Sequence, residues 1–288
     1  MAIPNAVSPA DQSAVLRGFS VEVTTRDASK LSELSHAVPK GTIISVPFLS
    51  TESDADRIAA ARMTRQAGYE PMPHIAARRL SSEAALSAIL SDLVNEAQVS
   101  RLLILAGDAD PPRGPFKDTA TILRSGILEH HGITHVSVAG HPEGHPVQSA
   151  AMLNATLLEK WQIFEKAGTD WSIFTQFAFT SQNVLAWIAE LRHSGIAAPI
   201  HIGIPGPASV KTLLKFAAVC GVSASTAVLK KYGLSITQLL SSAGPDELVG
   251  EYAAALGHMG YGDVRLHFYP FGGLLKTVNW LENYRSPH

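Results

Sequence analysis

RLLILAGDADPPRGPFKDTATILRSGILEHHGITHVSVAG, residues 101–140, is the stretch that decides the fold. It begins and ends with short apolar runs, which predict strands at Arg101–Ala106 and His135–Gly140. Between them, Lys117–His130 predicts a helix that is long enough to cross back over a sheet. A strand, a helix and a second strand in this order form a parallel βαβ unit.

The same alternation extends in both directions from this unit. We expect eight strands in all, at Phe19–Thr24, Thr42–Leu49, Glu70–Ala76, Arg101–Ala106, His135–Gly140, Asp170–Ala178, Pro199–Ile204 and Asp263–Tyr269. The other clear helices are Glu52–Ala67, Ser82–Glu96, Gln148–Lys166, Ser181–His193 and Ala208–Val219. The segment 221–262 is longer than one crossover needs and predicts extra helices before the last strand, at Ser223–Tyr232, Ile236–Ser242 and Asp246–Gly260.

Eight successive units favour a closed (β/α)8 TIM barrel, a fold of roughly 250 residues. A doubly wound open sheet is the alternative, but it usually has a glycine-rich turn after its first strand. Here that strand is followed by Thr24-Thr25-Arg26-Asp27, and neither GxGxxG nor GxxxxGK[ST] occurs as a phosphate-binding motif. Since no linker of biased composition divides the chain, residues 1–288 are expected to form one domain, with 1–17 as a lead-in.

The composition favours a small-molecule partner. The chain is 46% hydrophobic and 17% charged with a net charge of −2, so neither nucleic acid nor a membrane is an expected partner. Apolar runs such as Leu102–Ala106 are far shorter than the roughly 20 residues that span a bilayer. The single cysteine, Cys220, and a start without a secretory pattern indicate the cytoplasm. Any exposed helix face could form an interface, so a homo-oligomer stays open.

A carboxyl group inside the first strand is the clearest candidate for chemistry. Alternation places Ser20 and Glu22 on one face of that strand. A carboxyl group buried in a barrel has a raised pKa unless it is paired, so Glu22 is a candidate proton donor. The alternative is a structural ion pair with an interior Arg or Lys.

Other strands end in polar residues that can converge, because all βα loops of a barrel open on one face. These residues are His74, Gly107, Asp108, His141, Glu143, His145 and Gln176. For any one of them alone, the plainer interpretation is a side chain that satisfies loop backbone, and Asp108 could also cap the next helix or turn. The histidines between 130 and 145 do not predict a metal site, because the first two end a helix at the far end of a strand from the last two.

The strand-end residues form an ordered series along nearly the whole chain. It consists of Phe19-Ser20-Val21-Glu22, Pro73-His74, Gly107-Asp108, Pro142-Glu143-Gly144-His145-Pro146, Thr175-Gln176-Phe177-Ala178-Phe179, Gly203-Ile204 and His267-Phe268-Tyr269. Taken together, this series resembles methylenetetrahydrofolate reductases. The resemblance implies a (β/α)8 barrel with FAD, which passes a hydride between NAD(P)H and the one-carbon unit of 5,10-methylenetetrahydrofolate to give 5-methyltetrahydrofolate.

The resemblance also implies roles for individual residues. Glu22 corresponds to the general acid, and the chemistry suits a carboxylic acid kept protonated by burial, since an amine leaves carbon only when it is protonated. Asp108 matches an aspartate between flavin and folate, whose carboxylate can accept two N–H bonds from the amino-pyrimidinone edge. Gln176 matches a glutamine that contacts the folate. Flavin contacts are implied for His74, Gly107, Asp108 and His145.

The chain departs from the family pattern at several positions. Ala106 stands where an arginine usually precedes Gly-Asp, which removes a cation for the cofactor phosphates. Val210 replaces an aromatic residue that stacks on substrate or nicotinamide, and Gly272-Gly273 replace an arginine after the last strand. Further departures are Pro47-Phe48, His141 and Val147.

We therefore expect a flavin-dependent oxidoreductase that interconverts 5,10-methylenetetrahydrofolate and 5-methyltetrahydrofolate. Its direction and its use of NADH or NADPH stay open. The alternative is a folate-binding barrel that transfers or releases a one-carbon unit without flavin. A third hypothesis is a non-catalytic subunit of a larger reductase.

Overall fold

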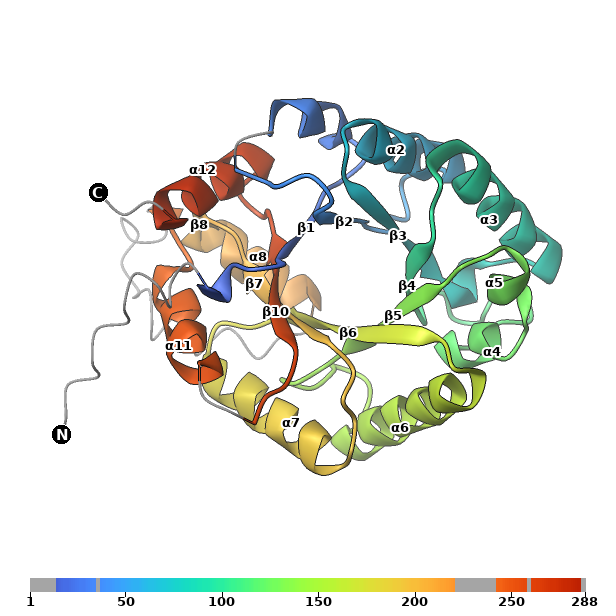
Figure 1. Cartoon of the computed structure of the whole chain (residues 1–288). Helices are drawn as coiled ribbons and strands as arrows, with labels where there is room; N and C mark the ends of the chain where they lie inside the picture. The colour runs from blue at the N-terminus through green and yellow to red at the C-terminus, as the bar shows by residue number, and fades with distance from the viewer. Residues whose placement is uncertain (1–13, 35–36, 221–241, 258–259, 286–288) are drawn as a thin grey trace. The chain divides into compact units, whose positions relative to one another are not determined.

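The structure is a computed structural model that describes residues 14–34, 37–220, 242–257 and 260–285. Its eight main strands form a closed barrel in the order β1-β10-β7-β6-β5-β4-β3-β2, with helices outside the strands (Figure 1). The strands are β1 (Ser20–Glu22), β2 (Ile43–Val46), β3 (Glu70–Ala76), β4 (Arg101–Leu105), β5 (His135–Gly140), β6 (Asp170–Phe177), β7 (Ile200–Pro205) and β10 (Val264–Tyr269). The predicted (β/α)8 barrel is confirmed.

Helices follow most strands. They are α2 (Asp54–Gln66), α3 (Glu83–Ala97), α4 (Thr119–Leu123), α5 (Ile127–His130), α6 (Ala150–Ala167), α7 (Ser181–His193), α8 (Val210–Cys220), α11 (Asp246–Leu256) and α12 (Leu274–Arg285), with short 3-10 helices η1 (Ala28–Glu33) and η2 (Ala77–Arg79). The prediction of one helix over Lys117–His130 is wrong. Helix α4 ends at Leu123, and Gly126, with a φ of +72°, precedes the first residue of α5 and keeps the two helices separate.

The extra helices before the last strand are described only in part. The helices expected at Ser223–Tyr232 and Ile236–Ser242 lie almost wholly outside the described residues. The third, expected at Asp246–Gly260, is α11 and ends earlier, at Leu256. A small antiparallel sheet of β8 (Ala208–Ser209) and β9 (Ser242–Ala243) was not expected. None of the described helices is both long and apolar enough to cross a bilayer.

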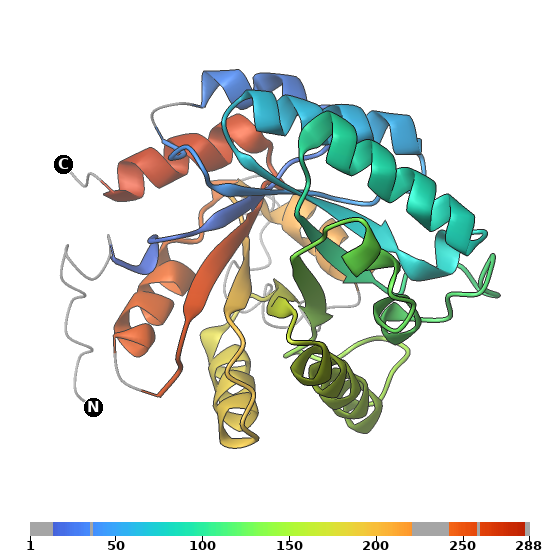
Figure 2. The same ribbon diagram turned by 45° about the vertical axis from the view of Figure 1, so that its right-hand side comes forward.

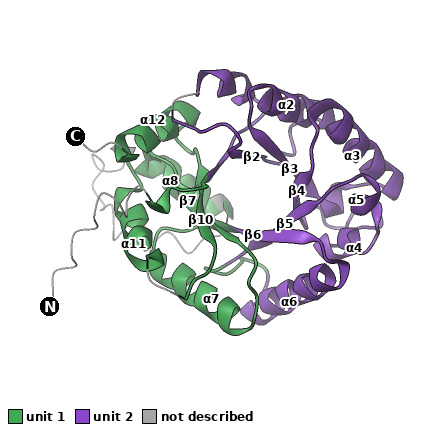
Figure 3. Ribbon diagram, in the orientation of Figure 1, with its two compact units in different colours: residues 1–19, 142–147, 175–288 green, residues 20–141, 148–174 purple. Residues whose placement is uncertain are grey.

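The chain divides into two compact units (Figure 3). Unit 1 comprises residues 1–19, 142–147 and 175–288, and unit 2 comprises residues 20–141 and 148–174. Unit 2 therefore holds β1 to β5 and the helices α2 to α6, whereas β7, β10 and the later helices belong to unit 1. Strand β6 contributes residues 170–174 to unit 2 and residues 175–177 to unit 1.

In unit 2, α2 and α3 lie side by side outside β2, β3 and β4 (Figure 2). Helix α3 begins where the Ser82 side chain accepts a hydrogen bond from the backbone N–H of Ala85. Its leucines at 86, 90 and 93 are almost fully buried and lie on one face, at spacings of three and four residues. This apolar stripe packs the helix against the strands.

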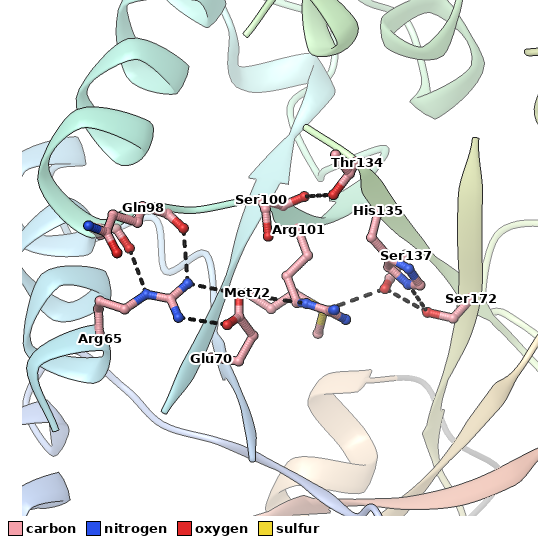
Figure 4. A network of polar contacts seen from close by, with 11 residues as sticks. Arg65, Glu70, Met72, Gln98, Ser100, Arg101, Thr134, His135, Ser137 and Ser172 are labelled. Atoms are coloured by element: carbon pink, nitrogen blue, oxygen red, sulfur yellow. Dashed lines mark hydrogen bonds and ion pairs between the residues drawn. The ribbon is translucent and has the colours of Figure 1, made fainter. Parts of the chain in front are cut away.

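Polar side chains at the amino-terminal ends of the unit 2 strands bind one another (Figure 4). Arg65 of α2 makes two hydrogen bonds, of 2.7 and 2.9 Å, to the carboxylate of Glu70 at the start of β3. The Ser172 hydroxyl of β6 lies 2.9 Å from Nε2 of His135 and 2.8 Å from the hydroxyl of Ser137. These contacts pair polar groups at the end of the strands that is opposite to the βα loops, among them the buried hydroxyls of Ser137 and Ser172.

In unit 1, β7 and β10 pair in parallel over their whole length, from Ile200 with Val264 to Pro205 with Tyr269. A side chain at Gly203 would place its Cβ 2.7 Å from the backbone nitrogen of Phe177, so only glycine fits between these segments. Buried aromatic and aliphatic residues from the end of β6 and from α8 form one cluster, which includes Phe177, Phe179, Val210 and Leu213.

Candidate functional site

Glu22 is the last residue of β1, and its register partner on β2 is Ser45. The residue is partly buried, and burial raises the pKa of its carboxyl from 4.5 to about 8. Among the described residues, none forms a hydrogen bond or ion pair with this carboxyl, so the structure offers no support for the alternative of an interior salt bridge. At neutral pH the Glu22 carboxyl therefore carries its proton.

His74 lies on β3, which pairs with β2. Its Nε2 is 2.6 Å from the hydroxyl of Ser45, and both side chains are buried. Burial, followed by the charge of Arg57, lowers the pKa of His74 to about 3. The imidazole is thus neutral at physiological pH. Register and hydrogen bonding place Glu22, Ser45 and His74 on three successive strands of unit 2.

Gly107 follows the end of β4, at a position that disfavours a side chain. Its φ is +84°, a left-handed conformation that disfavours other residues, and a Cβ there would lie 3.2 Å from the Cβ of Ala76. The next loop is held to β3 by a hydrogen bond of 2.9 Å from the backbone N–H of Arg78 to the carbonyl of Ala106. The strand ends of β3 and β4 are therefore closely packed.

Asp108 lies in this loop and is bound by an arginine that the sequence did not single out. Nε and Nη2 of Arg79 donate hydrogen bonds of 2.8 and 2.9 Å to Oδ1 and Oδ2 of Asp108. The Arg79 hydrogen bond is the main cause that lowers the pKa of Asp108, and Arg113 adds a smaller electrostatic effect. The alternative that Asp108 caps the next helix is wrong, because Asp118 caps α4.

The Arg79 side chain is only 19% exposed, whereas that of Asp108 is 73% exposed. The guanidinium groups of Arg79 and Arg57 lie 5.7 and 4.3 Å from the centre of the Phe48 ring. Phe48 belongs to the Pro47-Phe48 pair that departs from the family pattern. The only signal for Arg79 in the sequence is its place shortly after β3, and the pairing with Asp108 depends on the fold.

The other two expected site residues, Gln176 and His145, belong to unit 1. Oε1 of Gln176 accepts a hydrogen bond of 3.1 Å from the backbone N–H of Phe177. Nδ1 of His145 accepts one of 3.2 Å from the backbone N–H of Val147. Nearby in the chain, Glu143 lies 3.5 Å from the hydroxyl of Thr180, and burial raises the pKa of this carboxyl. That all the expected site residues contact one ligand stays a prediction.

Two departures from the family pattern have structural explanations in unit 1. Val210 is 1% exposed within the apolar cluster, so its side chain is not available to a ligand. A side chain at Gly272 would place its Cβ 2.0 Å from the carbonyl oxygen of Pro207. An arginine cannot occupy position 272 while the backbone takes this course.

A closed parallel barrel with polar side chains where its strands end defines the class to which this protein belongs, the (β/α)8 barrels. Within that class, the chain belongs to the methylenetetrahydrofolate reductase family, whose model matches residues 22–239. The match includes Glu22, His74, Asp108 and Gln176, and it confirms the predicted family.

A solved structure with a similar fold is described as an uncharacterized protein from Clostridium thermocellum that binds two copies of 5-methyl-5,6,7,8-tetrahydrofolic acid. The alignment has a TM-score of 0.59 and 10% sequence identity, and it covers 96% of this chain and 98% of the other. At this identity the likeness concerns the fold.

Proposed function

We propose that this protein is a flavin-dependent enzyme that interconverts 5,10-methylenetetrahydrofolate and 5-methyltetrahydrofolate. The observation that carries the proposal is the Glu22 carboxyl at the end of β1, where burial raises its pKa to about 8. An acid with a pKa near the working pH is suited to protonate a leaving amine. Membership of the methylenetetrahydrofolate reductase family supplies the reaction that needs such an acid.

The role of Glu22 is to open the five-membered ring of the substrate. Its proton goes to the amine nitrogen that leaves the bridging carbon, and the electron pair of the broken C–N bond stays on that nitrogen. The remaining iminium carbon accepts a hydride and becomes the methyl group. In the opposite direction a hydride leaves the methyl group, the amine re-forms its bond to carbon, and the Glu22 carboxylate takes back the proton.

Asp108 and Gln176 are proposed to hold the pterin ring. Asp108 is largely exposed, and Arg79 favours its ionised form, so a lone pair that Arg79 does not use can accept an N–H bond from the ligand. The amide of Gln176 can both donate and accept. Binding of 5-methyl-5,6,7,8-tetrahydrofolic acid by the Clostridium thermocellum protein, which shares the fold, supports a folate as the ligand class.

The residues of unit 2 also fit a flavin. Gly107 takes a left-handed backbone conformation and lies close to Ala76, so the loop after β4 keeps a course there that a residue with a side chain would disturb. His74 is neutral and so can accept or donate a single hydrogen bond without adding charge. We propose that His74, Gly107, Asp108 and, from unit 1, His145 contact the cofactor. When bound, the flavin would give or take the hydride.

The test is an absorbance spectrum of the purified protein, with and without added FAD, followed by anaerobic addition of 5-methyltetrahydrofolate. We expect the oxidised flavin spectrum to bleach. In Glu22→Gln this folate-driven bleaching should slow by roughly a hundredfold or more, because ring opening or closure lacks its acid–base group. Dithionite should still reduce the flavin in this variant, and the exposed Glu165→Gln on α6 serves as the control. If the purified protein is colourless and does not bind added FAD, the flavin assignment is wrong.

A second candidate is a folate-binding barrel that transfers or releases the one-carbon unit without flavin. It is favoured by Ala106, which cannot bind a phosphate, and by the buried Val210. The same absorbance spectra distinguish the two candidate functions. A protein with this second function binds 5-methyltetrahydrofolate but does not bind FAD.

A further inference from the structure

We infer that Arg79 and Asp108 act together as one recognition unit, which binds the adjacent N–H and C=O groups of a lactam in the ligand ring. This inference rests on the proposed function, because it specifies how the proposed site forms hydrogen bonds with the pterin or the flavin ring. It differs from recognition by Asp108 alone in making Arg79 a ligand-binding residue.

The first step is the way in which the two side chains share their hydrogen-bonding groups. The two parallel bonds, Nε to Oδ1 and Nη2 to Oδ2, use one hydrogen of each nitrogen and one lone pair of each oxygen. The end-on edge of the carboxylate is therefore already occupied, so it cannot also accept two parallel N–H bonds from a pterin. The Asp108 carboxylate also accepts a hydrogen bond from its own backbone N–H. On the side next to Nη2, the second hydrogen of Nη2 and the second lone pair of Oδ2 remain beside each other.

The second step is that these remaining groups are adjacent and point outward together. Nη2 and Oδ2 are 2.9 Å apart, so the pair presents a donor directly beside an acceptor. Among the described residues, none other than Asp108 accepts a hydrogen bond from the Arg79 guanidinium. Arg79 is largely buried and lies over the Phe48 ring, whereas Asp108 is mostly exposed, so the pair is anchored at one side and open at the other.

The third step is chemical complementarity. A lactam holds an N–H donor beside a C=O acceptor, which matches an acceptor beside a donor on the protein. The 4-oxo pterin of a folate has this arrangement at N3 and C4, and so does the pyrimidine ring of a flavin. In the same ring orientation a 2,4-diaminopteridine reverses both groups, because N3 becomes an acceptor and C4 carries an amino donor. A site built for hydrogen bonds rejects ligands that leave those bonds unmade.

The experiment measures dissociation constants for 5-methyltetrahydrofolate, its 4-amino-4-deoxy analogue and FAD, in the wild type and in Arg79→Lys. Lysine keeps the positive charge and one bond to Asp108 but loses the planar pair of donors. We expect the variant to bind one lactam ligand at least roughly tenfold more weakly, since a bond to a charged group is lost. Its affinity for the 4-amino analogue should not fall. Arg124→Lys is the matched control, because Arg124 forms an exposed ion pair with Glu159, also in unit 2.

The outcomes separate this inference from the proposed function. A loss confined to 5-methyltetrahydrofolate identifies the pterin as the lactam, and a loss confined to FAD identifies the flavin. If the wild type binds 5-methyltetrahydrofolate and Arg79→Lys changes nothing, or weakens the 4-oxo and 4-amino ligands equally, the inference is wrong and the proposed function stands. If the wild type binds neither 5-methyltetrahydrofolate nor FAD, both are overturned. Equal melting temperatures of the two variants show that folding does not explain the result.

Discussion

Replacing Glu22 by glutamine is expected to stabilise the protein, and to do so more at alkaline than at acid pH. Burial raises the pKa of the Glu22 carboxyl from 4.5 in the unfolded chain to about 8 in the fold. Between these values the folded state binds the extra proton, so the stability contributed by the neutral group is complete below pH 4.5 and is lost as pH rises through about 8. Glutamine has the same shape and does not titrate, so the variant escapes this loss.

The size of the stability difference follows from the change in the pKa of Glu22 on folding. Each pKa unit corresponds to about 1.4 kcal/mol, so the wild type should lose about 3.5 kcal/mol relative to Glu22→Gln between roughly pH 5 and pH 8. The buried His74 also titrates abnormally, since burial lowers its pKa to about 3. Because both proteins contain His74, its contribution cancels in the difference.

The assay is urea denaturation of both proteins across this pH range, monitored by tryptophan fluorescence and far-ultraviolet circular dichroism. The exposed Glu165→Gln is the control, and it should show the same stability difference from the wild type at every pH. A Glu22→Gln difference that does not grow with pH would refute the reasoning. Glu22 would then ionise like a solvated carboxyl, and the proton donor would have to be sought elsewhere.

Four further substitutions test local packing and backbone conformation by urea denaturation. Gly107→Ala and Gly126→Ala should each cost about 1–2 kcal/mol for the left-handed backbone, and Gly107→Ala should cost more because its Cβ meets Ala76. Equal costs would contradict the tight contact. Ser45→Ala should cost about 1–3 kcal/mol, since it leaves a buried ring nitrogen of His74 without its hydroxyl partner, and a neutral result would argue against that bond. Gly272→Ala should be the most damaging, at about 3 kcal/mol or more, because its Cβ overlaps the Pro207 carbonyl; a stable variant would show that the backbone there can move.

The barrel could be predicted because apolar runs and amphipathic stretches alternate through the whole chain. The division of Lys117–His130 into α4 and α5 could not, because the stretch is apolar enough for one helix and only the left-handed conformation of Gly126 interrupts it. The pairing of β8 with β9 was missed for a different reason. Two-residue strands carry no periodic signal in the sequence.

Glu22 could be singled out because a carboxyl group within an apolar strand has an energetic cost. Arg79 carries no such signal, since an arginine in a loop is ordinary and its bond to Asp108 joins residues that are 29 positions apart. Ala106 predicted that a cation for the cofactor phosphates is missing, and this stays a prediction. Arg79, which follows β3, binds Asp108 in the loop after β4.

The contact between Gly272 and Pro207 restricts how this corner of the barrel can evolve. Gly206 donates a backbone hydrogen bond of 2.8 Å to the carbonyl of Tyr269, and Gly272 lies directly against Pro207, so the ends of β7 and β10 are joined through main-chain atoms. An arginine at position 272 does not fit beside the Pro207 carbonyl. A descendant that gained one would first have to acquire a different path for residues 205–209, and the intermediate would lose stability before it gained any new contact.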